Sequence, residues 1–170
     1  MLFPIPSLEG LTTERLLFRR PVLDDRSWWM EYMSNAEAIR FMSLTLGSEA
    51  DCTLFIQRSL DRIGRDGSCL NVISERATQK PGGLIGLLTQ EVYGITELEI
   101  GYHLLPSAWG KGYASEAARA YQSSRSTVRS GGVEIAMCVT ASAAPATRSS
   151  CVVIARSACS SHSTLHARSS

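Results

Sequence analysis

The chain has 170 residues, of which 44% are hydrophobic and 19% charged, with a formal net charge of +1 at pH 7. This length and composition predict a single globular domain with its own core. The near-neutral charge gives no electrostatic reason to expect nucleic acid as a partner, and no apolar stretch approaches the roughly 20 residues of a membrane span.

The first half of the chain predicts a strand followed by three helices. Residues 1–10 lack the basic region of a signal peptide, so we expect an extended arm and a cytoplasmic protein. Residues 12–21 alternate in polarity and end at a proline, as a strand does. Residues 23–42 have apolar side chains at helical spacing with a break near residue 34, which predicts two short helices. Residues 48–67 predict a third helix, with one apolar side and glycines at its end.

The hydrophobic period then changes from helical to alternating. Residues 69–75, 83–92 and 97–105 read as strands, and the sequences QKPGG and YGIT between them are turn-forming. This order predicts an antiparallel meander. A helix should begin at Ala114, where strong helix formers follow the third strand.

The composition changes beyond Tyr121, where serine, alanine and arginine dominate and leucine almost disappears. Residues 133–140 are the one later segment with the pattern of a strand. We therefore assign residues 1–148 to the domain and expect 149–170 to be an atypical tail, either disordered or translated in a shifted reading frame.

The turn at residues 108–117, AWGKGYASEA, is the strongest local motif. Glycines at a strand-to-helix turn let the backbone approach a ligand, and the free amides of the helix N-terminus favour an anion such as phosphate. A P-loop is excluded because Gly112 follows Lys111 where serine or threonine is required. The dinucleotide motif is weak, because Ser115 stands at its third glycine and the preceding strands look antiparallel.

The longer stretch EIGYHLLPSAWGKGYASEAARA, residues 99–120, resembles the acetyl-coenzyme A (acetyl-CoA) signature of the GNAT N-acetyltransferases. The resemblance is greatest to the branch containing the ribosomal-protein acetyltransferases RimJ and RimL. The family loop [QR]xxGx[GA] is matched with Trp109 in place of glutamine or arginine. Together with LTTERLLFRRP, NAEAIRFM and GLIGL, the resemblance covers about residues 8–121. It implies an α+β fold of the GNAT kind, with a mostly antiparallel mixed sheet and helices on both faces.

The resemblance also implies a binding mode for acetyl-CoA as cosubstrate. Backbone amides of the loop would hold the pyrophosphate, the Ser115 hydroxyl would lie near a phosphate, and the strand at 99–105 would pair with the pantetheine arm. The implied cofactor-binding residues are Leu104, Leu105, Trp109, Gly110, Lys111, Gly112, Tyr113, Ala114 and Ser115. The alternative is a tight turn with a glycine cap and no ligand.

Acetyl transfer to an amine requires removal of the amine proton. Glu99 matches the strand position at which many family members carry the proton-accepting carboxylate, so the resemblance implies that it is catalytic. Glu97 and His103 fall on the same face of the strand and are further candidates, although each could be merely solvated or hydrogen-bonded. An aromatic cluster at helical spacing could wall the acceptor pocket or belong to the core: Trp28, Trp29 and Tyr32.

The predicted function is acetyl transfer from acetyl-CoA to a primary amine, by direct attack and without a metal. The acceptor would be a protein N-terminus or a small-molecule amine, and the enzyme a monomer or homodimer. Only Asp24 and Asp25 suggest an acidic pocket for a cationic acceptor. The five cysteines are odd in number and widely spaced, so we expect free thiols.

The alternative function is a catalytically impaired CoA-binding protein. It is favoured by Ala143 and Ala146, which replace the asparagine and serine of the family's C-terminal motif and leave only Arg148. No tyrosine follows Tyr121 to protonate the leaving thiolate.

Overall fold

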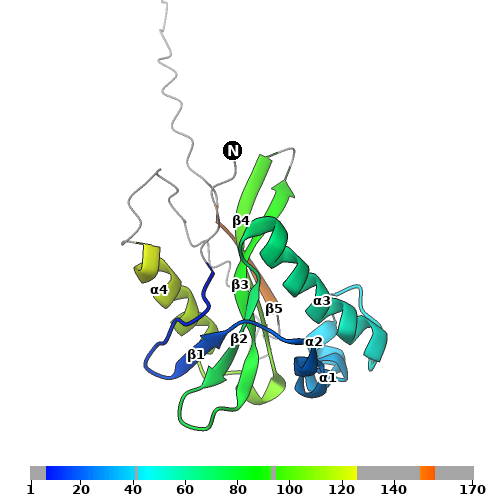
Figure 1. The fold of residues 1–170 in the computed structure, drawn as a ribbon. Helices are drawn as coiled ribbons and strands as arrows, with labels where there is room; N and C mark the ends of the chain where they lie inside the picture. The colour runs from blue at the N-terminus through cyan, green and yellow to red at the C-terminus, as the bar shows by residue number, and fades with distance from the viewer. Residues whose placement is uncertain (1–6, 41, 93–94, 126–149, 156–170) are drawn as a thin grey trace, which may run out of the picture.

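Five antiparallel strands form one sheet in the order β1-β2-β3-β4-β5 (Figure 1). The structure is a computed structural model that describes residues 7–40, 42–92, 95–125 and 150–155. The strands are β1 (Leu16–Arg19), β2 (Leu70–Glu75), β3 (Pro81–Val92), β4 (Ile95–Leu104) and β5 (Ser150–Ala155). The antiparallel meander predicted from the alternating segments is confirmed in β2, β3 and β4.

The helices begin and end where local sequence signals predict. They are η1 (Leu23–Asp25), α1 (Arg26–Met33), α2 (Ala36–Ile39), α3 (Glu49–Asp66), η2 (Pro106–Ala108) and α4 (Tyr113–Arg125). The Asn35 side chain caps α2 by accepting a hydrogen bond from the backbone amide of Ala38, which explains the break after α1. Ser48 caps α3 in the same way, and Gly67 ends that helix at φ +75°.

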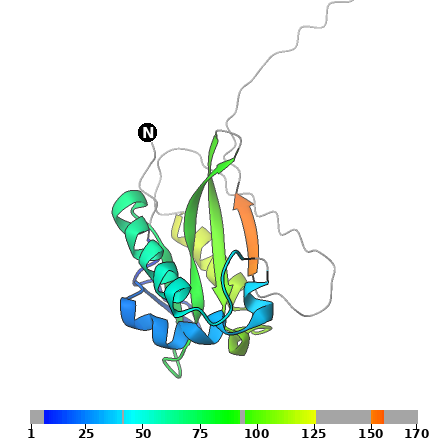
Figure 2. The same cartoon turned by 90° about the vertical axis from the view of Figure 1, so that its right-hand side faces the viewer.

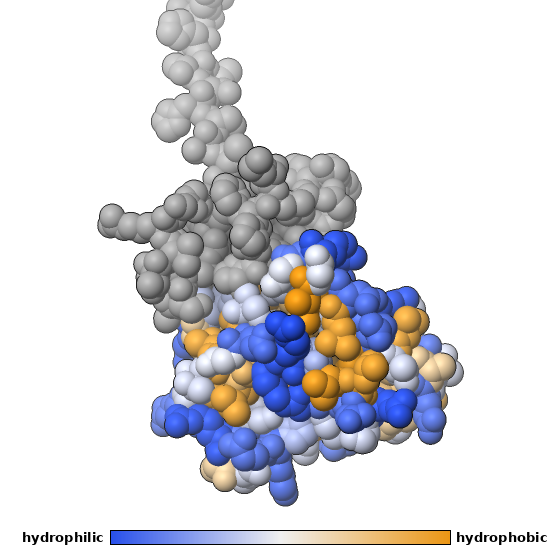
Figure 3. Space-filling view, in the orientation of Figure 1, coloured by the Kyte–Doolittle hydropathy of each residue, from blue (hydrophilic) through white to orange (hydrophobic). Residues whose placement is uncertain are grey.

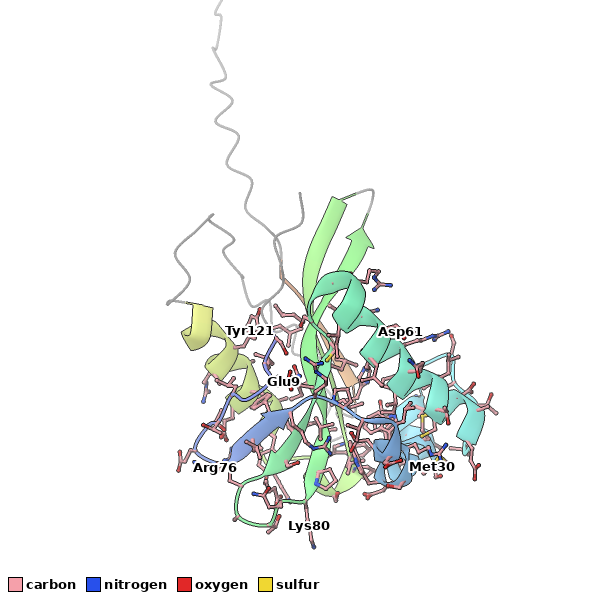
Figure 4. All side chains as sticks on the ribbon, viewed as in Figure 1. Glu9, Met30, Asp61, Arg76, Lys80 and Tyr121 are labelled. Atoms are coloured by element: carbon pink, nitrogen blue, oxygen red, sulfur yellow. The ribbon has the colours of Figure 1, made fainter. Side chains whose placement is uncertain are left out.

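Helices cover both faces of the sheet, so the strands have apolar side chains on each side. On one face α4 packs against Phe18, Ile85 and Ile100. On the other face α1 and α3 enclose Leu84 and Leu88 together with Trp29 and Ile56. The labelled Tyr121 of α4 and Met30 of α1 lie on opposite sides of the sheet (Figure 4). Successive residues of β3 thus alternate between two cores, as the pleat of a strand dictates.

The first strand is shorter than the sequence predicts, and this part of the prediction was wrong. Residues 12–21 were expected to be extended, but β1 contains only Leu16–Arg19. The chain doubles back just before it: the Thr13 amide donates to the Leu16 carbonyl and the Phe18 amide to the Leu11 carbonyl. This tight turn places residues 13–15 between Glu116 of α4 and Arg76, the residue that follows β2.

A further strand, β5, comes from the segment expected to be an atypical tail. It pairs with β4 from Leu98↔Ala155 to His103↔Ser150 and lies at the edge of the sheet (Figure 2). The strand predicted at 133–140 lies outside the described residues, and the division of the chain at residue 148 stays a prediction.

The surface is ordinary for a globular domain. Hydrophobic residues form a patch among hydrophilic ones on the face shown in Figure 3. The exposed large hydrophobic side chains of the described residues are Val22, Leu23, Leu46 and Leu54, and scattered exposure of this kind is normal. None of the helices that the structure describes is long and apolar enough to cross a bilayer.

Candidate active site

The glycine loop, which we define as residues Trp109–Gly112, connects η2 to the start of α4. Gly110 and Gly112 both adopt left-handed backbone conformations, with φ of +73° and +77°. Residues with a side chain adopt this conformation at a cost, so glycine is required for the shape of the turn. The Glu116 amide donates to the Gly112 carbonyl at 3.0 Å, which starts the helix directly after the loop. The preceding amides have no partner within the helix and are available to an anion.

Trp109, which departs from the family pattern, attaches the loop to the end of β4. Its indole Nε1 donates to the Leu104 carbonyl at 2.8 Å, and its ring packs against both cores. The Leu105 amide in turn donates to the Gly82 carbonyl on β3 at 3.0 Å. The loop is therefore held against the end of β4, where the predicted binding residues Leu104 and Leu105 lie.

Glu75, at the end of β2, forms hydrogen bonds with the two residues that flank Gly112. Its Oε1 accepts a hydrogen bond from the Tyr113 hydroxyl at 2.7 Å and from Lys111 Nζ at 2.9 Å. Its Oε2 accepts a hydrogen bond from the Thr78 hydroxyl. These hydrogen bonds, from Tyr113 first and then from Lys111, lower the pKa of Glu75 to about 2. The Lys111 ammonium is thus paired with a carboxylate.

Arg15 and Glu116 hold the loop from the other side. Arg15 donates from Nε to Glu116 Oε2 at 2.6 Å and from Nη1 to the Lys111 carbonyl at 3.0 Å. The other oxygen of Glu116 accepts the Thr13 hydroxyl and the Arg15 amide. An open cleft of about 830 Å³ lies here, with Gly112, Ser115 and Glu116 among its lining residues.

The predicted catalytic position, Glu99, lies in the middle of β4. It pairs with Leu88 of β3 and with Ile154 of β5. Residue 97 pairs with Gln90, and residues 97, 99 and 103 occupy the same face of the strand by alternation. Ile100 and Leu104 belong to the core on the α4 side, and His103 lies on the opposite face against Tyr32 of α1 and Phe55 of α3. The side chains of residues 97 and 99 lie outside the described part of the chain.

His103 is enclosed by aromatic side chains on that face. Its Nδ1 lies 3.2 Å from the Tyr32 hydroxyl, and its ring makes edge contacts with Tyr32 and Phe55. The Tyr32 hydroxyl donates its proton to the Ala38 carbonyl at 2.9 Å, so we assign the Nδ1–H tautomer, with Nε2 as the proton acceptor. Burial lowers the pKa of His103 to about 4, so its imidazole is neutral at pH 7.

The other aromatic and acidic candidates have structural roles. Trp29 and Tyr32 are fully buried and stack at 4.3 Å, so they belong to the core and do not line a pocket. Asp25 accepts hydrogen bonds from Arg19 at 2.6 and 2.8 Å and from the Trp28 indole at 2.6 Å. Burial opposes the ionisation of Asp25, but these bonds outweigh it and lower its pKa. The Asp25 carboxylate is thus ionised and already paired with Arg19, so it is unavailable to a cationic acceptor.

A family model described as an acetyltransferase (GNAT) domain matches residues 15–148. The chain belongs to the GNAT acetyltransferase family. The crystal structure of a GNAT-family acetyltransferase from Bacillus anthracis is similar to this GNAT chain, with 24% sequence identity and a TM-score of 0.53. The match covers 69% of the present chain and 66% of that one, and it supports the fold alone. A comparison with curated proteins finds no significant match.

Membership of the GNAT family and the structural match confirm the predicted α+β fold. The family is one of acyltransferases that use acetyl-CoA. Among the described residues, no cluster of three or more His, Cys, Asp or Glu side chains is arranged to hold a metal ion.

Sequence reasoning missed the side chains that hold this GNAT domain's glycine loop: Arg15, Glu75 and Glu116. In the sequence Arg15 stands within LTTERLLFRRP and Glu116 within residues 99–120, and nothing local marks either one as a support of the loop. No spacing rule connects Arg15 with Glu116 or Glu75 with Lys111, because these contacts bridge 101 and 36 residues. The one available signal was that Arg15 and Glu116 belong to segments that resemble the family.

Proposed function

We propose that this chain transfers an acetyl group from acetyl-CoA to a primary amine. The observation that supports this most directly is the pair of left-handed glycines at the start of α4, beside the end of β4. A Cβ at Gly110 would meet no atom within 4 Å, so a ligand can approach the backbone there. The free amides of the first turn are suited to the pyrophosphate, and the Ser115 hydroxyl would assist them.

Acetyl-CoA would supply the acetyl group as a reactive thioester, and the residues of the chain would orient it and handle protons. Glu99 would accept the proton of the attacking amine, directly or through a water. Glu97 is the second candidate for this base, and neutral His103 would relay a proton through Nε2. An α-amine with a pKa near ~8 is neutral far more often at pH 7 than a lysine side chain, so a protein N-terminus would require less of this base.

Direct attack in a ternary complex is favoured over a covalent enzyme intermediate. Cys52 and Cys69 are buried and unpaired. Burial raises the pKa of both thiols, that of Cys69 to about 11, and a thiol is a poor nucleophile unless it is ionised. Neither of these cysteines is suited to carry the acetyl group.

The proposed acceptor is a protein N-terminus, as in the RimJ and RimL branch that the sequence resembles, or a small-molecule amine. Because the Asp25 carboxylate is paired with Arg19, it gives no preference for a positively charged acceptor. We further propose that the protein works in the cytoplasm as a monomer or homodimer.

A specific observation favours the second function, a CoA-binding protein with impaired catalysis. The pantetheine arm is expected to add to the edge of β4 as an extra strand would. In the structure β5 pairs with that edge from Leu98 to His103. Pantetheine would then be limited to Leu104 and beyond, or would have to displace β5.

The test is calorimetric titration with acetyl-CoA followed by a turnover assay on peptide N-termini and small amines. Binding with turnover would support the acetyltransferase. Binding without turnover by the full chain, but with turnover after deletion of residues 149–170, would support inhibition by β5. Absence of binding to both proteins would refute the proposed function.

A further inference from the structure

Arg15 binds a carbonyl of the glycine loop. Its guanidinium holds the Lys111 carbonyl at 3.0 Å. The described peptide bonds are all trans, and in a trans peptide the N–H points opposite to the C=O of the preceding residue. The Gly112 amide is therefore turned away from Arg15. The Gly112 carbonyl is itself held by the Glu116 amide, which turns the Tyr113 amide toward the open end of the helix.

Arg15 is itself fixed by several contacts. Its Nε and Nη2 both lie 2.6 Å from Glu116 Oε2, and its guanidinium carbon lies 5.1 Å from the centre of the Tyr113 ring. The Arg76 guanidinium, in the β2–β3 turn and labelled in Figure 4, donates to the Thr13 carbonyl at 2.9 Å. The backbone around Arg15 is thus attached to both β2 and α4, and the side chain starts from a fixed point.

Glu75 supports the same turn from the sheet. It binds Lys111 by its ammonium group and Tyr113 by its hydroxyl, while Arg15 binds the carbonyl of Lys111. The two residues that flank Gly112 are therefore each attached to a charged side chain from the N-terminal half of the chain. Fixing both neighbours limits the rotation of the peptide planes between them.

The charges in this arrangement are matched. A free carboxylate beside a helix N-terminus would compete with an anionic ligand for the amides. Glu75 is paired with Lys111 at 2.9 Å, and Glu116 is paired with Arg15 at 2.6 Å. Each carboxylate can thus hold the loop without presenting an unpaired negative charge to a pyrophosphate.

We propose that Arg15 and Glu75 are positioning residues that fix the glycine loop in its anion-binding conformation before the cosubstrate arrives. This inference rests on the proposed function, since the anion is the pyrophosphate of acetyl-CoA. In this inference two residues outside the loop pre-organise it, which reduces the free-energy cost of ordering the loop when the ligand binds.

The experiment compares Arg15→Ala and Glu75→Ala with two matched controls, Arg20→Ala and Glu9→Ala. Arg20 and Glu9 form an exposed ion pair at 2.8 Å, so each control removes the same charge at the surface. We expect the Kd and KM for acetyl-CoA to rise about tenfold in Arg15→Ala and Glu75→Ala, with kcat little changed and the controls near wild type. Glu75→Gln, which keeps an acceptor for Tyr113, should recover part of the loss.

Two further measurements separate positioning from a general loss of structure. S-acetylpantetheine lacks the pyrophosphate, so its kcat/KM should be the same in wild type and in Arg15→Ala. Hydrogen exchange without ligand should be faster in Arg15→Ala at residues 109–116 and unchanged in β2 and β3. The thermal midpoint of each variant checks that it is folded. If Arg15→Ala is not folded, Arg15→Lys takes its place in these measurements.

Each result has a defined meaning. Affinity in Arg15→Ala equal to that in Arg20→Ala, or an equal loss with S-acetylpantetheine, would overturn the inference. If wild type itself bound no acetyl-CoA, the proposed function would fail, and hydrogen exchange in Arg15→Ala and Glu75→Ala would still decide whether the two residues hold the loop. Unchanged exchange at residues 109–116 would overturn the inference whatever the ligand.

Discussion

Placing a negative charge on the glycine loop should weaken acetyl-CoA binding by an amount that electrostatics can bound. Gly110 is the cleanest position, because a Cβ atom there would meet no atom within 4 Å. At Gly112 a new Cβ would lie 3.7 Å from Arg15 Nη2, and an added carboxylate could pair with that group. We therefore compare Gly110→Glu with Gly110→Gln, which differ in charge but hardly in shape.

Gly110→Glu and Gly110→Gln share the cost of backbone strain but differ in electrostatic repulsion of the ligand. Any side chain at φ +73° imposes about 1–2 kcal/mol of backbone strain, and this appears equally in both. Only glutamate adds repulsion with the pyrophosphate. A charge about 5 Å away contributes about 1–3 kcal/mol for an effective dielectric constant between about 80 and 20. The Kd of Gly110→Glu should thus exceed that of Gly110→Gln by about 5- to 150-fold.

The assay is calorimetric titration of both variants with acetyl-CoA at low and high salt. The difference between them should shrink at about 1 M salt, where the Debye length falls to about 3 Å. S-acetylpantetheine, which lacks the pyrophosphate, should not distinguish the two variants. Equal affinity of Gly110→Glu and Gly110→Gln at low salt would refute a pyrophosphate site at this loop.

Three further predictions concern single residues. Glu99→Gln should lower kcat about 100-fold near pH 7, with the Kd for acetyl-CoA unchanged. The loss should be smaller at high pH, where more of the amine is already neutral. A kcat and a pH–rate profile equal to those of the wild type would exclude Glu99 as the base. Trp109→Phe leaves the Leu104 carbonyl without its indole donor, so urea unfolding should show a loss of about 1–2 kcal/mol; a loss of affinity without a loss of stability would contradict this structural role. His103 is neutral in the folded protein at pH 7, because its folded pKa of about 4 lies below the ordinary histidine pKa of 6.5. Its contribution to stability is therefore complete above pH 6.5 and falls toward pH 4, by at most about 1.4 kcal/mol per pH unit. In His103→Gln the unfolding free energy measured over this window should vary less with pH, and an unchanged slope would show that another group titrates there.

The sequence by itself determined the local elements, and the anion-binding site stays a prediction from it. The end of α3 is encoded by Gly67, which adopts the left-handed conformation, and the break before α2 by the Asn35 cap. The alternating period of β2 to β4 predicted the meander, and the two loop glycines predicted an anion-binding turn. These features depend on the conformational preferences of one residue or on neighbours a few positions apart, so a single sequence contains them.

Only the tertiary structure decided how the loop is held and what surrounds His103. Lys111 looks from the sequence like a cation available to phosphate, yet the fold pairs it with Glu75, 36 residues away. Arg15 meets Glu116 across 101 residues, and His103 meets Tyr32 across 71. Such contacts depend on which strands become neighbours and on which face each side chain emerges. Their energies arise only when the sheet and its helices assemble, because no local preference brings charges so far apart in the chain to within hydrogen-bonding distance.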